Sequence, residues 1–149
     1  GGQMDVLGHS MGGKAAMVLA LLHPDAVRKL VVADIAPVAY GHTQIHLIEA
    51  MESLDLDAMG GRAEANEALK STVEDEGVRA FLLQSLDVKN HEWRLNLQVL
   101  AREMPKIIGF PDVTGRFDRT AFFLTGATSS CVTADHRPDI KRLFPSARV

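Results

Sequence analysis

A serine between closely spaced glycines is the residue of this sequence best suited to chemistry. Gly8, Ser10 and Gly12 form a Gly-x-Ser-x-Gly pattern. In a sharp turn between a strand and a helix, such a serine is held in a strained backbone and its hydroxyl stands clear to attack a carbonyl carbon. We expect the two glycines to let strand and helix approach closely, because they carry no Cβ. The unpaired N–H groups of the helix N-terminus favour the negative charge that develops during acyl transfer.

The flanking segments have the composition that this turn requires. Residues 3–7 are short and apolar, which predicts a buried strand, and residues 14–22 are rich in Ala, Leu and Met, which predicts a helix. A glycine-rich turn with an inert serine, or a phosphate-binding loop, is the alternative. Lys14 is followed by Ala15 instead of Ser or Thr, so a Walker-type phosphate loop is disfavoured. The pattern in this context favours a serine hydrolase.

A carboxylate follows the next predicted strand. Residues 30–34 are an apolar, β-branched run that ends in Asp34, as in a parallel strand buried on both faces. Sites in open α/β sheets form at the carboxyl ends of strands, where Ser10 and Asp34 would both lie. We interpret Asp34 as the acid of a catalytic triad. The alternative is a carboxylate that caps the following turn, and Asp135 is a reserve candidate for the acid.

Three segments are predicted, and together they indicate an α/β fold with a parallel sheet and flanking helices. Residues 1–40 and 111–149 contain the predicted strands and form the sheet-containing part. Residues 41–110 show helical periodicity with no convincing buried strand, as in a helical lid inserted between strands. The remaining expected elements are helices near 45–51, 62–73, 77–86, 96–104 and 133–143, and strands at 121–125 and from 147.

Composition excludes several classes of protein. The chain has 149 residues, of which 46% are hydrophobic, and a formal net charge of −3, so neither nucleic acid nor an anionic membrane is an expected partner. No apolar stretch is long enough to span a bilayer. The single Cys131 allows no internal disulfide, which fits a reducing compartment. His42 and His46 are four residues apart, but no third ligand stands at a recognisable spacing, so we predict no metal site.

Several runs together resemble the α/β-hydrolase superfamily, and within it the small-esterase group of bacterial esterases and eukaryotic abhydrolase-domain proteins. These runs are residues 8–14, 32–38, 93–96, 123–126 and 143–145. The resemblance implies an ester hydrolase with Ser10 as the nucleophile, Asp34 as the acid and the backbone N–H of Met11 as an oxyanion-hole donor. It also implies a helical cap over an acyl pocket, a small-molecule ester as the substrate, and no metal or organic cofactor.

Two parts of the family pattern are missing from these residues. The resemblance implies a histidine from a Gly-His segment after the last residue and a second oxyanion donor from a His-Gly loop before Gly1. We therefore expect the sequence to be an internal fragment of a longer hydrolase, cytoplasmic or, in a eukaryote, in an organellar matrix. A thioesterase, lactonase or amidase on the same fold, and a non-catalytic member that binds a ligand or partner, stay open as alternatives. The oligomeric state is not predicted.

Overall fold

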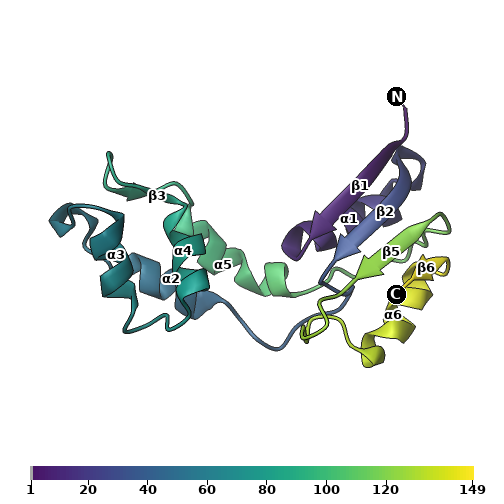
Figure 1. Ribbon diagram of the computed structural model, residues 1–149. Helices are drawn as coiled ribbons and strands as arrows, with labels where there is room; N and C mark the ends of the chain where they lie inside the picture. The colour runs from purple at the N-terminus through teal and green to yellow at the C-terminus, as the bar shows by residue number, and fades with distance from the viewer. Residues whose placement is uncertain (1) are drawn as a thin grey trace. The chain divides into compact units, whose positions relative to one another are not determined.

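The computed structural model describes residues 2–149, which divide into two compact units (Figure 1). The core unit consists of the residues up to Gly41 together with Lys106–Val149, and the helical unit consists of His42–Pro105. Each unit has its own buried residues. Among residues 2–149, no helix combines the length and apolar character that crossing a bilayer requires.

A four-stranded parallel sheet forms the centre of the core unit. Its strands are β1 (Met4–His9), β2 (Val27–Ala33), β5 (Ala121–Leu124) and β6 (Ala147–Arg148), in the order β1-β2-β5-β6. Parallel neighbours need a crossover, and helix α1 (Met11–Leu22), with the 3-10 turn η1 (Pro24–Ala26), supplies it between β1 and β2. The predicted α/β fold with a parallel sheet and flanking helices is confirmed.

The core packs apolar side chains of α1 and α6 (Arg137–Leu143) against the sheet. Met17 from α1, Leu30 from β2 and Ile140 from α6 are fully buried in one cluster. Phe144 contacts Phe123 of β5, with ring centroids 5.4 Å apart. This packing fixes the sheet and α1, and therefore also the turn between β1 and α1.

Element boundaries in the core unit differ from the predicted ones in several places, and β2 begins three residues earlier, at Val27. Strand β1 continues to His9, and α1 begins at Met11 instead of Lys14, so a single residue separates strand from helix. The helix predicted over 133–143 is divided into a 3-10 turn, η3 (Ala134–His136), and α6. Pro138 lies in the first turn of α6, where its missing N–H costs nothing.

The helical unit contains α2 (Ile45–Glu52), η2 (Leu56–Ala58), α3 (Arg62–Leu69), α4 (Glu76–Leu83) and most of α5 (Leu97–Ile108). The sequence predicts no buried strand in residues 41–110, and the structure adds a short antiparallel hairpin there, in which β3 (Leu86–Asp87) pairs with β4 (Glu92–Trp93). The predicted helices over 62–73 and 77–86 end earlier, at the bounds of α3 and α4.

Helix α5 is longer than the sequence predicts. We expected it to end at Met104, because proline disfavours the helical conformation in the residue before it. Instead it continues through Pro105 to Ile108. The carbonyl of Ile108 accepts hydrogen bonds from the Tyr40 N–H, at 3.0 Å, and from the Lys14 ammonium, at 2.6 Å. The end of α5 thus has partners from distant parts of the core unit, which local sequence rules do not include.

Candidate active site

Ser10 occupies the tight turn between β1 and α1. Its backbone has φ 51° and ψ −123°, a conformation that costs a non-glycine residue about 1–3 kcal/mol. The surrounding backbone enforces it, because the Ser10 N–H donates to the Ala33 carbonyl at 3.0 Å. The Ser10 carbonyl in turn accepts from Gly13 N at 2.8 Å and Lys14 N at 3.2 Å, which starts α1. Ser10 is exposed, as a nucleophile must be.

Two glycines at the elbow permit close packing, namely Gly8, as expected, and Gly13 in place of Gly12. A Cβ on Gly8 would lie 2.2 Å from the Gly12 carbonyl oxygen, and one on Gly13 would lie 2.5 Å from Cγ2 of Ile35. A Cβ on Gly12 would meet no described atom within 4 Å. The expectation for Gly12 was therefore wrong: at the elbow, Gly8 and Gly13 are the positions where a Cβ would overlap neighbouring atoms.

Asp34 follows β2 directly and is also strained, with φ 55°. Its N–H donates to the carbonyl of Leu124, the last residue of β5, at 2.7 Å. Among the described residues, only Ser10, Asp34 and His91 combine a side chain with a positive φ. Two of these three are the residues that the sequence marked as nucleophile and acid. Strained backbone of this kind clusters at functional sites.

The carboxylate of Asp34 is held by the loop that follows β5. The hydrogen bond with the Ser129 hydroxyl is the strongest influence that keeps the pKa of Asp34 below its usual value, while partial burial opposes it. The Gly126 N–H, at 3.4 Å, and the Thr125 hydroxyl, at 3.3 Å, also donate to Oδ1 and lower this pKa. Asp34 is thus stabilised as the anion. The reserve candidate Asp135 is exposed in η3.

Ser10 and Asp34 lie at the same edge of the sheet. His9 and Ala33, the residues before them, are paired in the register of β1 and β2, so the two follow adjacent parallel strands at their carboxyl ends. Met11 is the first residue of α1, and the first N–H groups of a helix have no partner within it. Within residues 2–149, no three His, Cys, Asp or Glu side chains cluster as metal ligands do.

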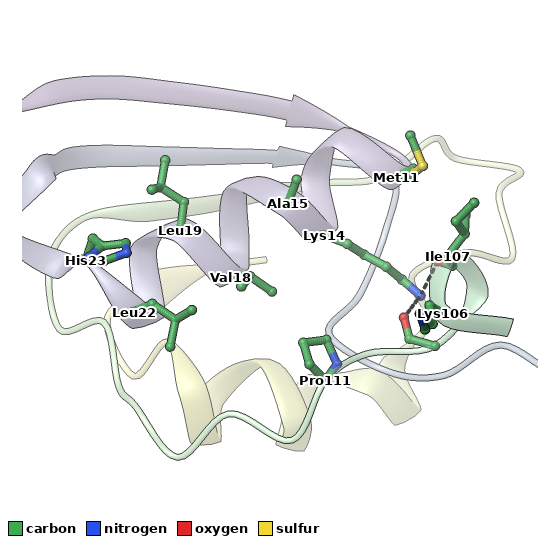
Figure 2. A pocket seen from close by; sticks show the side chains of 11 residues that line it. Met11, Lys14, Ala15, Val18, Leu19, Leu22, His23, Lys106, Ile107 and Pro111 are labelled. Atoms are coloured by element: carbon green, nitrogen blue, oxygen red, sulfur yellow. Dashed lines mark hydrogen bonds between the residues drawn. The ribbon is translucent and has the colours of Figure 1, made fainter. Parts of the chain in front are cut away.

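A buried lysine beside the elbow was missed by the sequence analysis. Lys14, in the first turn of α1, is only 7% exposed and donates to carbonyl oxygens at the end of α5. It borders a shallow hollow of about 470 Å³ that runs along α1 from Met11 to His23 (Figure 2). The available signal was that Lys14 is the only charged residue between Met11 and Leu22.

The parallel sheet, the strained serine between strand and helix, and the carboxylate one strand away define an α/β protein with a nucleophile-elbow site. The chain belongs to the alpha/beta hydrolase fold family, whose model matches residues 1–106. The predicted resemblance to this superfamily is therefore confirmed.

Named relatives support the same family. The chain is 37% identical to the sn-1-specific diacylglycerol lipase ABHD11 of Danio rerio, over 99% of this chain and 49% of that protein. It is 38% identical to Esterase YbfF of Escherichia coli strain K12, over 95% of this chain and 55% of that protein. A solved structure titled "Marine microorganism esterase" is 32% identical, with a TM-score of 0.91, over 99% of this chain and 60% of that one. The chain spans about half the length of the curated relatives that it matches.

Proposed function

We propose that the full-length protein hydrolyses carboxylic esters through an acyl-enzyme formed on Ser10. The observation that carries the proposal is the pair of strained residues, Ser10 and Asp34, at the ends of adjacent parallel strands. The names of the relatives, an esterase and a lipase, agree with this chemistry. The roles of Ser10, Asp34 and Met11 are part of the proposal.

The proposed reaction has two steps. A histidine from a part of the protein outside this sequence takes the hydroxyl proton of Ser10, whose oxygen attacks the ester carbonyl carbon. The N–H of Met11 donates to the oxyanion, and collapse expels the alcohol, which takes the proton from the imidazolium. Water, deprotonated by the same histidine, then attacks the acyl-enzyme and releases the carboxylic acid and Ser10.

Asp34 is proposed to hold the imidazole in the correct tautomer and to stabilise the imidazolium. This role requires a carboxylate that stays ionised. The hydrogen bonds from Ser129, Gly126 and Thr125 favour the anion, and they come from a loop 91 residues or more away in the sequence. We further propose that the helical unit is the cap of this hydrolase and contributes to binding the acyl group.

Labelling of the full-length protein with a fluorophosphonate tests the nucleophile. We expect covalent modification at Ser10, its loss in Ser10→Ala, and retention in the control Ser71→Ala, which removes an exposed hydroxyl from the helical unit. Ser10→Ala should lower kcat for a p-nitrophenyl ester by at least about a thousandfold. Asp34→Asn should lower it by about ten-thousandfold, since the imidazole then adopts the wrong tautomer.

Substrate comparison separates the remaining classes. Matched ester, thioester, lactone and amide substrates are compared by kcat/KM in the full-length protein. A clear preference for the thioester, lactone or amide would mean that Ser10 is the nucleophile but that the substrate is not a simple carboxylic ester. Full-length protein that folds but is not labelled at Ser10 would instead indicate a non-catalytic member that binds a ligand or partner.

A further inference from the structure

Lys14 places a buried positive charge directly after the elbow. Its side chain extends from α1 to the end of α5 (Figure 2). There Nζ donates to the carbonyls of Ile108 at 2.6 Å, Gly109 at 2.5 Å and, more weakly, Ile107 at 3.5 Å. Among the described residues, it forms no ion pair with a carboxylate. A buried ammonium without a counter-ion is uncommon, because its desolvation is costly.

The acceptors explain how this charge is accommodated. The last carbonyls of a helix have no partner within it and carry the negative end of the helix dipole. An ammonium offers three donors and a full charge, so it satisfies several of these carbonyls together. The ammonium also lies 4.8 Å from the centroid of the Tyr40 ring, within the range of a cation–π interaction.

These contacts involve both connections between the core unit and the helical unit. The chain leaves the core unit after Gly41, directly after Tyr40, and re-enters it at Lys106, directly before the carbonyls that Lys14 holds. The two connections are also bonded to each other, since the Tyr40 N–H donates to the Ile108 carbonyl at 3.0 Å. Lys14 therefore contacts the outgoing and the returning chain together.

Tyr40 extends this cluster to the segment that follows the acid. Its hydroxyl accepts from the N–H of Ala36, two residues after Asp34, at 2.8 Å and donates to the Cys131 carbonyl at 2.5 Å. Lys14 and Tyr40 thus join α1, the segment after Asp34, and both connections. All these atoms belong to the core unit.

We propose that Lys14 is a positioning residue whose ammonium fixes both connections to the helix that begins at the elbow. Tyr40 and Ile107 are then held against α1, so any flexibility of the two connections lies in the residues after Tyr40 and before Ile107. The catalytic consequence rests on the proposed function, in which the helical unit helps to bind the acyl group. We call the contacts of the Lys14 ammonium with Tyr40 and with residues 107–109 the clamp, and the clamp itself is independent of that function.

Hydrogen exchange in the full-length protein tests the clamp directly. Lys14→Met keeps the side-chain length and removes the charge and the donors, and we expect exchange of the Tyr40 amide to accelerate at least about tenfold. The Leu30 amide, bonded to the Thr120 carbonyl at 3.0 Å within the core, should keep its protection. Lys29→Met, the same change on an exposed lysine of β2, is the control and should leave both amides unchanged. Unchanged exchange at Tyr40, or equal acceleration at both amides, would overturn the proposal.

Kinetics separate positioning from a general structural role. The hydrogen bonds that hold Ser10 do not involve the Lys14 ammonium, so in Lys14→Met we expect kcat for a long-chain ester to stay within about threefold while KM rises about tenfold. Lys14→Arg, which keeps a cation and donors, should recover most of this loss. A fall in kcat with unchanged KM would contradict the positioning role.

Amine acylation tests the wild-type protein and needs no variant to fold. Treatment of full-length protein with N-hydroxysuccinimide acetate should modify Lys29 readily and leave Lys14 at least about tenfold less modified, because its ammonium is buried and hydrogen-bonded. Comparable modification of the two would overturn the clamp. Neither acylation nor exchange reports ester hydrolysis, so a protein that is unlabelled at Ser10 but keeps both results would refute the proposed function and leave the clamp standing.

Discussion

Gly8 is the position in the elbow where an added methyl group should overlap most closely with neighbouring backbone. In Gly8→Ala, the new Cβ would lie 2.2 Å from the Gly12 carbonyl oxygen, 2.6 Å from its carbon and 2.7 Å from the Gly13 Cα. All three atoms are backbone, so no side-chain rotation relieves the overlap. Non-bonded heavy atoms are normally about 3.5–4.0 Å apart, so β1 and α1 must separate by more than about 1 Å.

The cost follows from that displacement. Overpacking a core costs about 1–3 kcal/mol when side chains can adjust, and a backbone clash should lie at or above the upper end, near 3 kcal/mol. A shift of about 1 Å between strand and helix also displaces Ser10, which joins them, and misplacement of this size costs about a hundredfold in rate. Urea unfolding and p-nitrophenyl ester hydrolysis by the full-length variant measure the two effects separately.

Gly12→Ala is the matched control in the same motif. Its Cβ would meet no described atom within 4 Å, and alanine is favoured over glycine in a helix by about 0.5–1 kcal/mol. We expect its unfolding free energy to be unchanged or slightly higher and its rate to stay within a few-fold of wild type. Equal damage from the two substitutions, or a Gly8→Ala protein that behaves as wild type, would refute the assignment of the close contact to Gly8.

Two further predictions concern Asp34 and the helical unit. Ser129→Ala removes the strongest influence that lowers the pKa of Asp34, so we expect that pKa to rise, as 13C NMR titration of the Asp34 carboxyl in the full-length protein measures, while Ser130→Ala, at an exposed neighbour, should leave it unchanged. Arg79 is 6% exposed and donates to two backbone carbonyls at 2.7 Å, so Arg79→Met should lower the free energy of unfolding by about 2–3 kcal/mol, and the exposed Arg102→Met should change it little in the same urea titration.

The elbow could be predicted from sequence because its causes are local. A short apolar run, a serine between glycines and an alanine-rich run together specify strand, turn and helix over about twenty residues. Asp34 was accessible by the same kind of reasoning, since a carboxylate directly after a buried strand must lie at the edge of the sheet. Parallel pairing of β1 and β2 then places it beside Ser10. Periodicity also located the helices of the helical unit, although their ends were misplaced by several residues.

The features that sequence reasoning missed depend on contacts between distant residues. The carbonyls that Lys14 holds are 93–95 residues away in the chain, and no local pattern around Lys14 identifies them. The same contacts accompany the extension of α5 past Pro105, where local propensity predicts its end. The β3–β4 hairpin has two residues in each strand, too few for alternation to be recognised.

Backbone hydrogen bonds hold Ser10 and Asp34 in the same way, so the positions of these two residues do not depend on their side chains. Each follows the last residue of a strand, and each donates its N–H to the carbonyl of the last residue of the neighbouring strand: Ser10 to Ala33, and Asp34 to Leu124. The hydrogen-bonding ladder of the sheet therefore continues one residue past the carboxyl ends of β1 and β2. Because the packed core fixes the sheet, it also enforces the positive φ angles there. Substitution of either side chain should thus abolish the proposed ester hydrolysis while leaving the backbone of the elbow in place.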